Sequence, residues 1–402
     1  MPADEPPVSA TEGLPIAPSL TPVLTAEHVT ARPSLVDRRV LVVSGLACTI
    51  AAASAGVAHV LTRLIGLFTN LAFYGRLSTA FVSPAGHRLG AMVVFVPVLG
   101  GLVVGLLARF GSTAIRGHGI PEAMEQVLTN ESRIPPRITF LKPLSAAIAI
   151  GTGGPFGAEG PIIATGGALG SLVGQVLHVT AVERKTLLAA GAAAGMAATF
   201  GSPVSAVLLA VELLLFEYRP RSLIPVALAA ATAAGVRIAV EGSDPIFAMP
   251  DLVQPSGAAL GWYMIAGALV GLVSVGITRA VYWVEDAFGH LPLHWMWWPA
   301  LGGLVVGVVG YFAPRTLGVG YDNIEQILSG RVALGAVLML CGLKFVSWVV
   351  ALGSGTSGGT LAPLFTIGGG LGAGLGAAAN ALVPALEVDI RIAALVGMAA
   401  MF

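Results

Sequence analysis

The chain has 402 residues, of which 55% are hydrophobic and only 10% are charged. This composition is too apolar for a soluble globular protein, in which about 25% of residues are charged, and it favours a membrane protein. Lysine plus arginine and aspartate plus glutamate each total 21, so no excess of charge points to nucleic acid as a partner. Cys48 and Cys341 lie far apart in apolar segments and predict no disulfide framework.

The first 38 residues differ in composition from the rest of the chain. Residues 1–38 are rich in Pro, Ser, Thr and Ala and contain no long apolar segment, so we expect a disordered N-terminal tail and not a signal peptide. Apolar runs then alternate with short polar segments and predict helices over 40–70, 89–109, 139–151, 162–178, 187–200, 204–217, 222–240, 257–287, 298–313, 333–352, 363–382 and 392–402. Several are shorter than the roughly 20 residues that cross a bilayer, which predicts broken helices that end in a cavity inside the membrane.

The second half of the chain repeats the first. The segment PVLGGLVVG at 97–105 returns as PALGGLVVG at 299–307, a shift of 202 positions. The same shift aligns Lys142 with Lys344, and chance similarity between apolar segments would not keep one register across lysine, glycine and proline. A duplicated membrane unit with broken helices is typical of a transporter or channel whose site lies between the halves.

The repeat also predicts how the chain is divided. We expect a first membrane repeat at 39–250 and a second at 251–402. Phe402 aligns with Phe200, so the second repeat has no counterpart of 201–240. We therefore expect a second repeat that is truncated at its C-terminal end by about 40 residues and a pore that lacks one wall.

One ionisable residue stands at the head of an apolar helix. Glu159 lies in GAEGP at 157–161, directly before the glycine-studded apolar run 162–174. Pro161 suits the first helical turn, and the preceding glycines permit a sharp turn that leaves N–H groups free. Those groups and the positive end of the helix dipole form a site for an anion. Glu159 would occupy this site or swing out to admit a free ion; the alternative is a simple helix cap.

Similar helix starts recur at two other places. GHGIP at 117–121 and the segment 358–363 resemble 157–161 in their glycines and proline, and three positive helix ends that converge predict an anion site. Lys142 and Lys344, each 17 residues before the Glu159 or Leu361 position, would add positive potential. The alternative for both lysines is that they extend to the membrane interface.

Three short motifs resemble the signatures of the CLC family of anion channels and proton-coupled anion antiporters: GHGIP at 117–121, GAEGP at 157–161 and GTLAP at 359–363. The resemblance runs from about residue 40 to the end of the chain. It implies an all-α integral membrane protein of two inverted repeats with tilted and broken helices, the second one incomplete here. It also implies a multi-pass protein of the bacterial inner membrane that forms a homodimer with one pore per subunit.

The resemblance assigns roles to individual residues. It implies that Glu159 is the gating glutamate and that a pore-lining tyrosine lies in the segment that this chain lacks. The anion contacts, most of them through backbone N–H groups, are expected at His118, Gly119, Ile120, Gly160, Thr360, Leu361 and Ala362. No cofactor or metal ion is implied.

The chain departs from the family pattern at three positions. His118 stands where the chloride-type signature has Ser, and Leu361 stands where an aromatic Phe is usual. Leu213 occupies the position of an acid that relays protons in many antiporters. The remaining candidate relays are Glu217, one helical turn beyond on nearly the same face, and the adjacent Glu212.

We therefore expect CLC-type transport of chloride across a lipid bilayer through a pore gated by Glu159, coupled to proton antiport. The alternatives are a passive chloride channel and a transporter for another small anion, such as nitrate or fluoride. A membrane enzyme with Glu159, His118 and a lysine as acid–base groups is less favoured, because the chain contains neither His-Glu-x-x-His nor Gly-x-Ser-x-Gly. A cation carrier would need carboxylates or helix C-termini at its site, whereas this sequence offers helix N-termini.

Overall fold

The computed structural model describes residues 38–177, 179–250 and 252–402. The predicted tail at 1–38 lies outside the described residues, apart from Arg38. Within the described ranges every regular element is helical, and the one extended pairing is an isolated bridge between Gly157 and Gly359. Seven of the described helices are long and apolar enough to cross a membrane. The protein is therefore an all-helical, multi-pass integral membrane protein.

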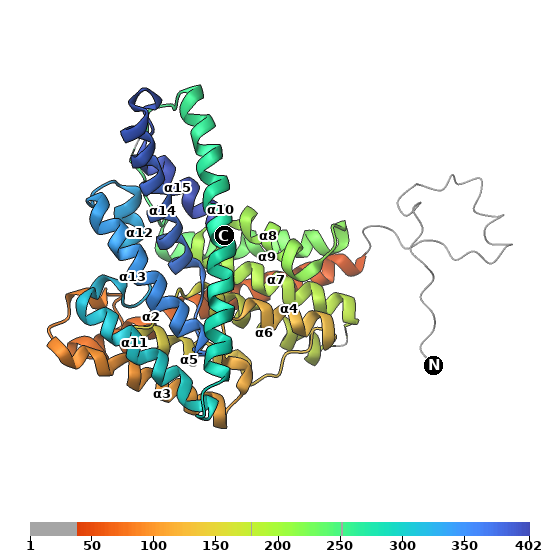
Figure 1. The fold of residues 1–402 in the computed structure, drawn as a ribbon. Helices are drawn as coiled ribbons and strands as arrows, with labels where there is room; N and C mark the ends of the chain where they lie inside the picture. Colours follow the sequence, from red (N-terminus) through yellow and green to blue (C-terminus); the bar gives the residue numbers. More distant parts are fainter. Residues whose placement is uncertain (1–37, 178, 251) are drawn as a thin grey trace.

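The helices follow one another with short connections (Figure 1). The first half contains α2 (Arg38–Tyr74), α3 (Phe95–Phe110), α4 (Ile120–Thr129), α5 (Ile138–Gly151), α6 (Glu159–Val176), α7 (Ala181–Phe200), α8 (Pro203–Ala210) and α9 (Pro220–Glu241). The second half contains α10 (Gly257–Gly289), α11 (Trp298–Phe312), α12 (Tyr321–Leu328), α13 (Leu334–Gly353), α14 (Leu361–Leu382) and α15 (Ile390–Met401).

Every apolar span expected from the sequence forms a helix. The expected spans omit α4 and α12, because these two helices are short and carry acidic residues on one face, so neither forms an apolar run. The helix expected over 204–217 is also shorter than predicted. It continues from α8 through a π-helical turn, Val211–Leu215, and Phe216 then adopts a left-handed conformation with φ of 53°. Glu217 consequently lies beyond the helix.

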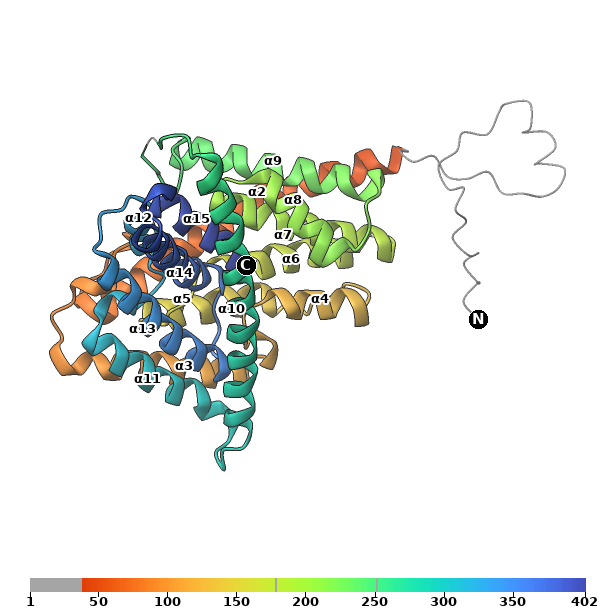
Figure 2. The same ribbon diagram turned by 45° about the horizontal axis from the view of Figure 1, so that its top comes forward.

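The two halves pack through equivalent helices. Helices α3 and α11 lie side by side (Figure 2). A Cβ atom on Gly101 of α3 would collide with the carbonyl of Pro299, and one on Gly303 of α11 would collide with the carbonyl of Pro97. These two contacts are related by the shift of 202, so the sequence repeat corresponds to a repeat in space. Small residues are required here because the two backbones approach too closely for side chains.

Helix α10 is the longest element of the second half and crosses the front of the molecule in Figure 1. It packs against α13 and α15. One face of α10 remains free of these helices and forms part of the wall of a large cavity that also reaches the loops before α4 and α14.

Candidate functional site

The second and third motifs meet backbone to backbone. The Gly157 N–H donates to the Gly359 carbonyl at 2.9 Å, and the Gly359 N–H donates to the Gly157 carbonyl at 2.8 Å. The two glycines are related by the shift of 202, so this bridge links equivalent points of the two repeats. The Gly358 N–H also donates to the Gly117 carbonyl at 3.4 Å, which attaches the first motif. The predicted convergence of three helix starts is confirmed.

Glu159 lies at this junction. Its side chain is fully buried in the first turn of α6. It folds back over Gly157. Its carboxylate lies so close to this glycine that a Cβ atom there would collide with it. Oε1 accepts a hydrogen bond of 2.6 Å from the Tyr321 hydroxyl, while Oε2 has no hydrogen-bond partner. A buried carboxylate with one oxygen unsatisfied is costly, so it indicates a task beyond that of a helix cap.

Tyr321 is a site residue that the sequence analysis missed. It is the first residue of α12, directly after Gly320, whose φ is 81°. Its ring stacks on Phe81 with a centroid distance of 6.2 Å and meets Phe247 edge-on at 5.8 Å. The repeat contained a signal for this residue. The first residue of the short helix is the apolar Ile120 in the first repeat but Tyr321, which carries a hydroxyl group, in the second.

His118 and its neighbours form the turn that precedes α4. The Nδ1 atom of His118 is buried without a hydrogen-bond partner. The Gly119 N–H, which we expected to contact an anion, instead donates to Oε2 of Glu122 at 2.7 Å. Glu122 of the same helix thus caps this N–H group, and the anion contact at Gly119 stays a prediction. Gly160 packs directly beneath this turn, since a Cβ atom there would collide with the His118 carbonyl.

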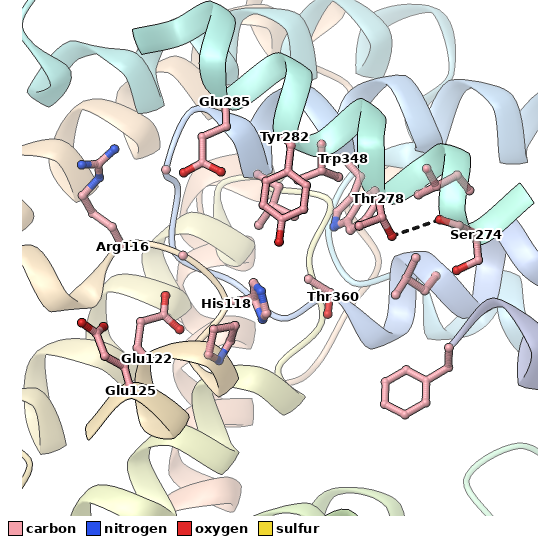
Figure 3. Close-up of a pocket in the computed structure, with 18 of the residues that line it drawn as sticks. Arg116, His118, Glu122, Glu125, Ser274, Thr278, Tyr282, Glu285, Trp348 and Thr360 are labelled. Carbon is pink, nitrogen blue, oxygen red and sulfur yellow. Dashed lines mark hydrogen bonds between the residues drawn. The ribbon is translucent and has the colours of Figure 1, made fainter. Parts of the chain in front are cut away.

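A cavity of about 720 Å³ opens beside His118 and is called the His118 cavity below. Thr360, the residue before α14, also lines it, and its side chain makes no capping hydrogen bond to the helix. Figure 3 shows His118 and Thr360 around the same space, with Tyr282 of α10 facing them. The side chains of Leu361 and Ala362 are buried. These residues could therefore bind an anion only through the free backbone N–H groups at the N-terminal end of α14.

Charged groups of both signs surround the His118 cavity. Arg116 lines it together with Glu122, Glu125 and Glu285. Figure 3 places Glu122 and Glu125 on α4 and Glu285 on α10. Glu122 is engaged by the Gly119 N–H. The side-chain charges alone therefore do not select an anion, and the helix N-termini supply the positive potential.

Lys142 and Lys344 are buried, with exposures of 1% and 0%. The Nζ atom of Lys142 donates to the carbonyls of Ile115, Arg116 and Gly117 at 2.9–3.2 Å. The Nζ atom of Lys344 donates to the carbonyls of Thr316 and Gly318 at 2.9 and 2.7 Å. The alternative in which these lysines reach the membrane interface is wrong. Each lysine holds the loop before a short helix, α4 or α12.

A second cavity, of about 290 Å³, lies beside the first turn of α6 and is called the Tyr321 cavity below. Its walls include Ala158, Ile162 and Tyr321, and its charged groups are His59, Arg237 and Glu241. Glu241 is 3.4 Å from both the His59 ring and the Arg237 side chain. The two cavities share no lining residue. Each cavity is lined by one residue of the junction around Glu159. Tyr321 lines the Tyr321 cavity, and Thr360 lines the His118 cavity.

The two candidate proton relays lie away from these cavities. Glu212 is exposed, and neither Glu212 nor Glu217 lines the His118 or the Tyr321 cavity. Glu217 accepts a hydrogen bond of 2.5 Å from Ser222 and lies 3.6 Å from Arg219. The argument that placed Glu217 one turn beyond Leu213 is wrong, because the helix ends at Leu215.

Comparison with known proteins identifies the family. Residues 100–402 match the voltage gated chloride channel family. The chain is 31% identical over 366 residues to the H(+)/Cl(-) exchange transporter ClcA of Vibrio vulnificus, covering 87% of this chain and 77% of the relative. It is 32% identical over 338 residues to chloride channel protein CLC-f of Arabidopsis thaliana, covering 77% of this chain and 42% of that protein.

Solved structures agree in fold. A slow cyanobacterial Cl-/H+ antiporter superposes with a TM-score of 0.77 at 21% identity, over 91% of this chain and 85% of the other. A CLC-type fluoride/proton antiporter superposes with a TM-score of 0.71 at 21% identity, over 90% and 86%. The chain therefore belongs to the CLC family and is a membrane transport protein for anions, not an enzyme.

Proposed function

We propose that the chain exchanges chloride for protons through a pathway that the Glu159 carboxylate blocks. The observation that carries the proposal is the position of this carboxylate. It is fully buried at the N-terminus of α6, with one unsatisfied oxygen. Residues around it line two cavities that share no lining residue: Ala158 and Tyr321 line one, and His118 and Thr360 line the other.

The blocking role follows from electrostatics. The N-terminal ends of α6 and α14 favour negative charge, so a carboxylate tethered there competes with a free anion for one place. Protonation removes the charge of Glu159 and with it the attraction to the helix end. The side chain can then leave, and an anion takes its place. A group that alternates between these two states can tie anion movement to proton movement.

The choice of chloride rests on the relatives. ClcA of Vibrio vulnificus is named as an exchanger of protons and chloride. A structural neighbour of the same fold is instead a fluoride/proton antiporter, and His118 differs from the Ser of the chloride-type signature. Flux of chloride, nitrate, bromide and fluoride from liposomes, measured side by side, tests this choice. Faster nitrate or fluoride flux than chloride flux would contradict it.

The first test is Glu159→Gln, which keeps the shape of the side chain and removes its charge. In liposomes, wild-type flux should rise as pH falls, whereas the variant should conduct at all pH values without moving protons. Glu131→Gln is the matched control, because Glu131 pairs with Arg133 and Arg184 and none of the three lines either cavity. A Glu159→Gln variant that keeps the wild-type pH profile would contradict the gating role.

The second test concerns proton coupling, for which the alternative is a passive channel. Since Glu217 lies outside the helix, we propose water in the His118 cavity as the proton route, with Glu217 as the competing relay. The reversal potential is measured under a pH gradient with symmetric chloride. A value of zero means a passive channel. A shift that survives Glu217→Gln supports the water route, and a shift that disappears assigns the relay to Glu217.

The homodimer also belongs to this proposal. The family implies one pore in each of two subunits, and cross-linking of the protein in lipid vesicles would test it. A single-subunit species at all protein-to-lipid ratios would contradict the dimer.

A further inference from the structure

The contact between Tyr321 and Glu159 joins the gate of one repeat to a helix of the other. The hydroxyl of Tyr321 lies 2.6 Å from Oε1 of Glu159 and is the one side-chain donor to this carboxylate in the described structure. Hydrogen bonds to an ionised acceptor are about twice as strong as neutral ones. The contact therefore favours the charged, inward form of Glu159 over the protonated form.

The tyrosine is held in place independently of Glu159. Phe81 and Phe247 pack on two sides of its ring, and Gly320 fixes the start of α12. Lys344 binds the Gly318 carbonyl and secures the loop that leads to it. The hydroxyl is thus presented by a rigid support, which is what a positioning group requires.

The surroundings provide space for a released carboxyl group. The Tyr321 cavity has a volume of about 290 Å³ and is lined by Ala158, Ile162 and Tyr321 itself. Tyr321 therefore both contacts the buried Glu159 and borders open space. When the hydrogen bond breaks, the side chain of Glu159 can rotate past the tyrosine into this cavity.

We propose that the Tyr321 hydroxyl is a latch that holds Glu159 in its blocking position and must let go before an anion passes. The inference rests on the proposed function, in which Glu159 blocks the pathway. It makes Tyr321 a positioning residue that acts through Glu159. It also assigns the latch to the second repeat alone, since the equivalent position in the first repeat is Ile120, which has no donor.

The latch predicts how opening depends on pH. Because the hydroxyl stabilises the charged carboxylate, its removal should let Glu159 take up a proton at higher pH. Other titratable or charged groups lie on the surrounding elements. The His118 cavity is lined by His118, Arg116, Glu122, Glu125 and Glu285, and the Tyr321 cavity by His59, Arg237 and Glu241. Asp322 lies on α12, and Lys142 and Lys344 bind the loops before α4 and α12. The experiment must therefore isolate Glu159.

Infrared difference spectroscopy does so, because the C=O stretch of a protonated carboxyl group reports Glu159 directly and the band is assigned by its loss in Glu159→Gln. Tyr321→Phe keeps the ring and removes the hydroxyl. We expect the titration midpoint of this band to move to higher pH by about one to two units. Incorporation of 3-fluorotyrosine at position 321, a stronger donor of the same shape, should move it to lower pH.

Tyr263→Phe is the matched control, since it removes another buried tyrosine hydroxyl, at Asp389, away from the site. It should leave the band unchanged. Flux gives the second readout: Tyr321→Phe should open the pathway at higher pH, and it should have no further effect in the Glu159→Gln background. An effect that persists in that background would assign Tyr321 a merely structural role and overturn the latch.

The outcomes separate the latch from the proposed function. A band that shifts as expected without any anion flux shows that Tyr321 stabilises the charged Glu159 but contradicts the transport proposal. Flux that is gated by Glu159, with no shift in either position-321 variant, overturns the latch alone. If Tyr321→Phe does not fold, the 3-fluorotyrosine protein decides, because its shape is nearly unchanged.

Discussion

Positions 159 and 361 begin equivalent helices, α6 and α14, and their preceding glycines form one reciprocal backbone bridge. At one position stands a glutamate and at the other a leucine, both buried. The backbone is thus repeated while the ionisable group is present once. Two buried carboxylates at this junction would repel one another at low local dielectric, so a single gate is the arrangement that the electrostatics favour.

The short helices α4 and α12 also differ in their first residue. Helix α12 begins with Tyr321, which binds Glu159, whereas α4 begins with Ile120, whose partner position across the bridge is Leu361. A hydrogen-bond donor, Tyr321, therefore pairs with an acid, Glu159, at one junction of the repeats. At the equivalent positions of the other junction both residues are apolar. Each half supplies what the other lacks, so neither repeat contains a complete gate.

An acid placed in the second repeat tests why only the first repeat carries a buried carboxylate. Leu361→Glu buries a carboxylate that has no donor, and we expect a loss of about 3–5 kcal/mol in the free energy of unfolding. Adding Ile120→Tyr would recreate the latch and should recover part of that loss. Thermal unfolding in detergent measures both variants. If Leu361→Glu is as stable as the wild type, the missing donor does not explain the asymmetry.

The buried lysines test the part of the scaffold that the repeats share. Lys142→Met removes three hydrogen bonds to loop carbonyls, of which only that of Gly117 keeps another donor, the Gly358 N–H. Lys344→Met removes two, from the carbonyls of Thr316 and Gly318. We expect losses of about 2–4 kcal/mol, because each buried unsatisfied carbonyl costs about 1–3 kcal/mol. The loss should be larger for Lys142, which makes one more hydrogen bond than Lys344. Lys185→Met is the control, because Lys185 donates to a single carbonyl, that of Leu215, and should cost least. Equal losses in all three would contradict the ranking by hydrogen bonds.

The smallest expected effect concerns His118, whose counterpart in the second repeat is Val319. If the imidazole contacts the anion, His118→Ser should shift selectivity towards chloride over nitrate by about fivefold, as for one hydrogen bond of about 1 kcal/mol. It should also weaken any pH dependence of the flux that protonation of the imidazole contributes. Relative chloride and nitrate flux at several pH values measures both effects. Unchanged ratios would mean that backbone N–H groups alone bind the ion.

Much of this fold could be predicted from the sequence because hydrophobicity and glycine spacing are local signals. The apolar spans formed helices, and the shift of 202 between 97–105 and 299–307 proved to be a relation in space. The convergence of the three motifs followed from their repeated glycines and prolines. Helices α4 and α12 were overlooked as spans because their acidic faces interrupt any apolar run.

The packing of the last helix shows a limit of sequence alignment. The alignment pairs Gly195 with Gly397, yet Gly397 makes the close contact to α14 that Gly191 makes to α6. The shift of 202 would place that contact at residue 393, so α15 is displaced by four residues, about one helical turn. A shift of α15 along its axis by one turn keeps the same helix face in the contact. The helical period of the sequence is unchanged by such a shift and therefore cannot detect it.

The sequence by itself determined the family, the repeat and the identity of Glu159 as the buried acid, because these depend on residue type and spacing along the chain. Only the tertiary structure decided what each acid or base contacts. It assigned Tyr321 to Glu159, Glu122 to the Gly119 N–H, and the two buried lysines to loop carbonyls. The physical reason is that a buried polar group is stabilised by whichever partner the fold brings within hydrogen-bond distance. For Glu159 that partner lies 162 residues away in the other repeat.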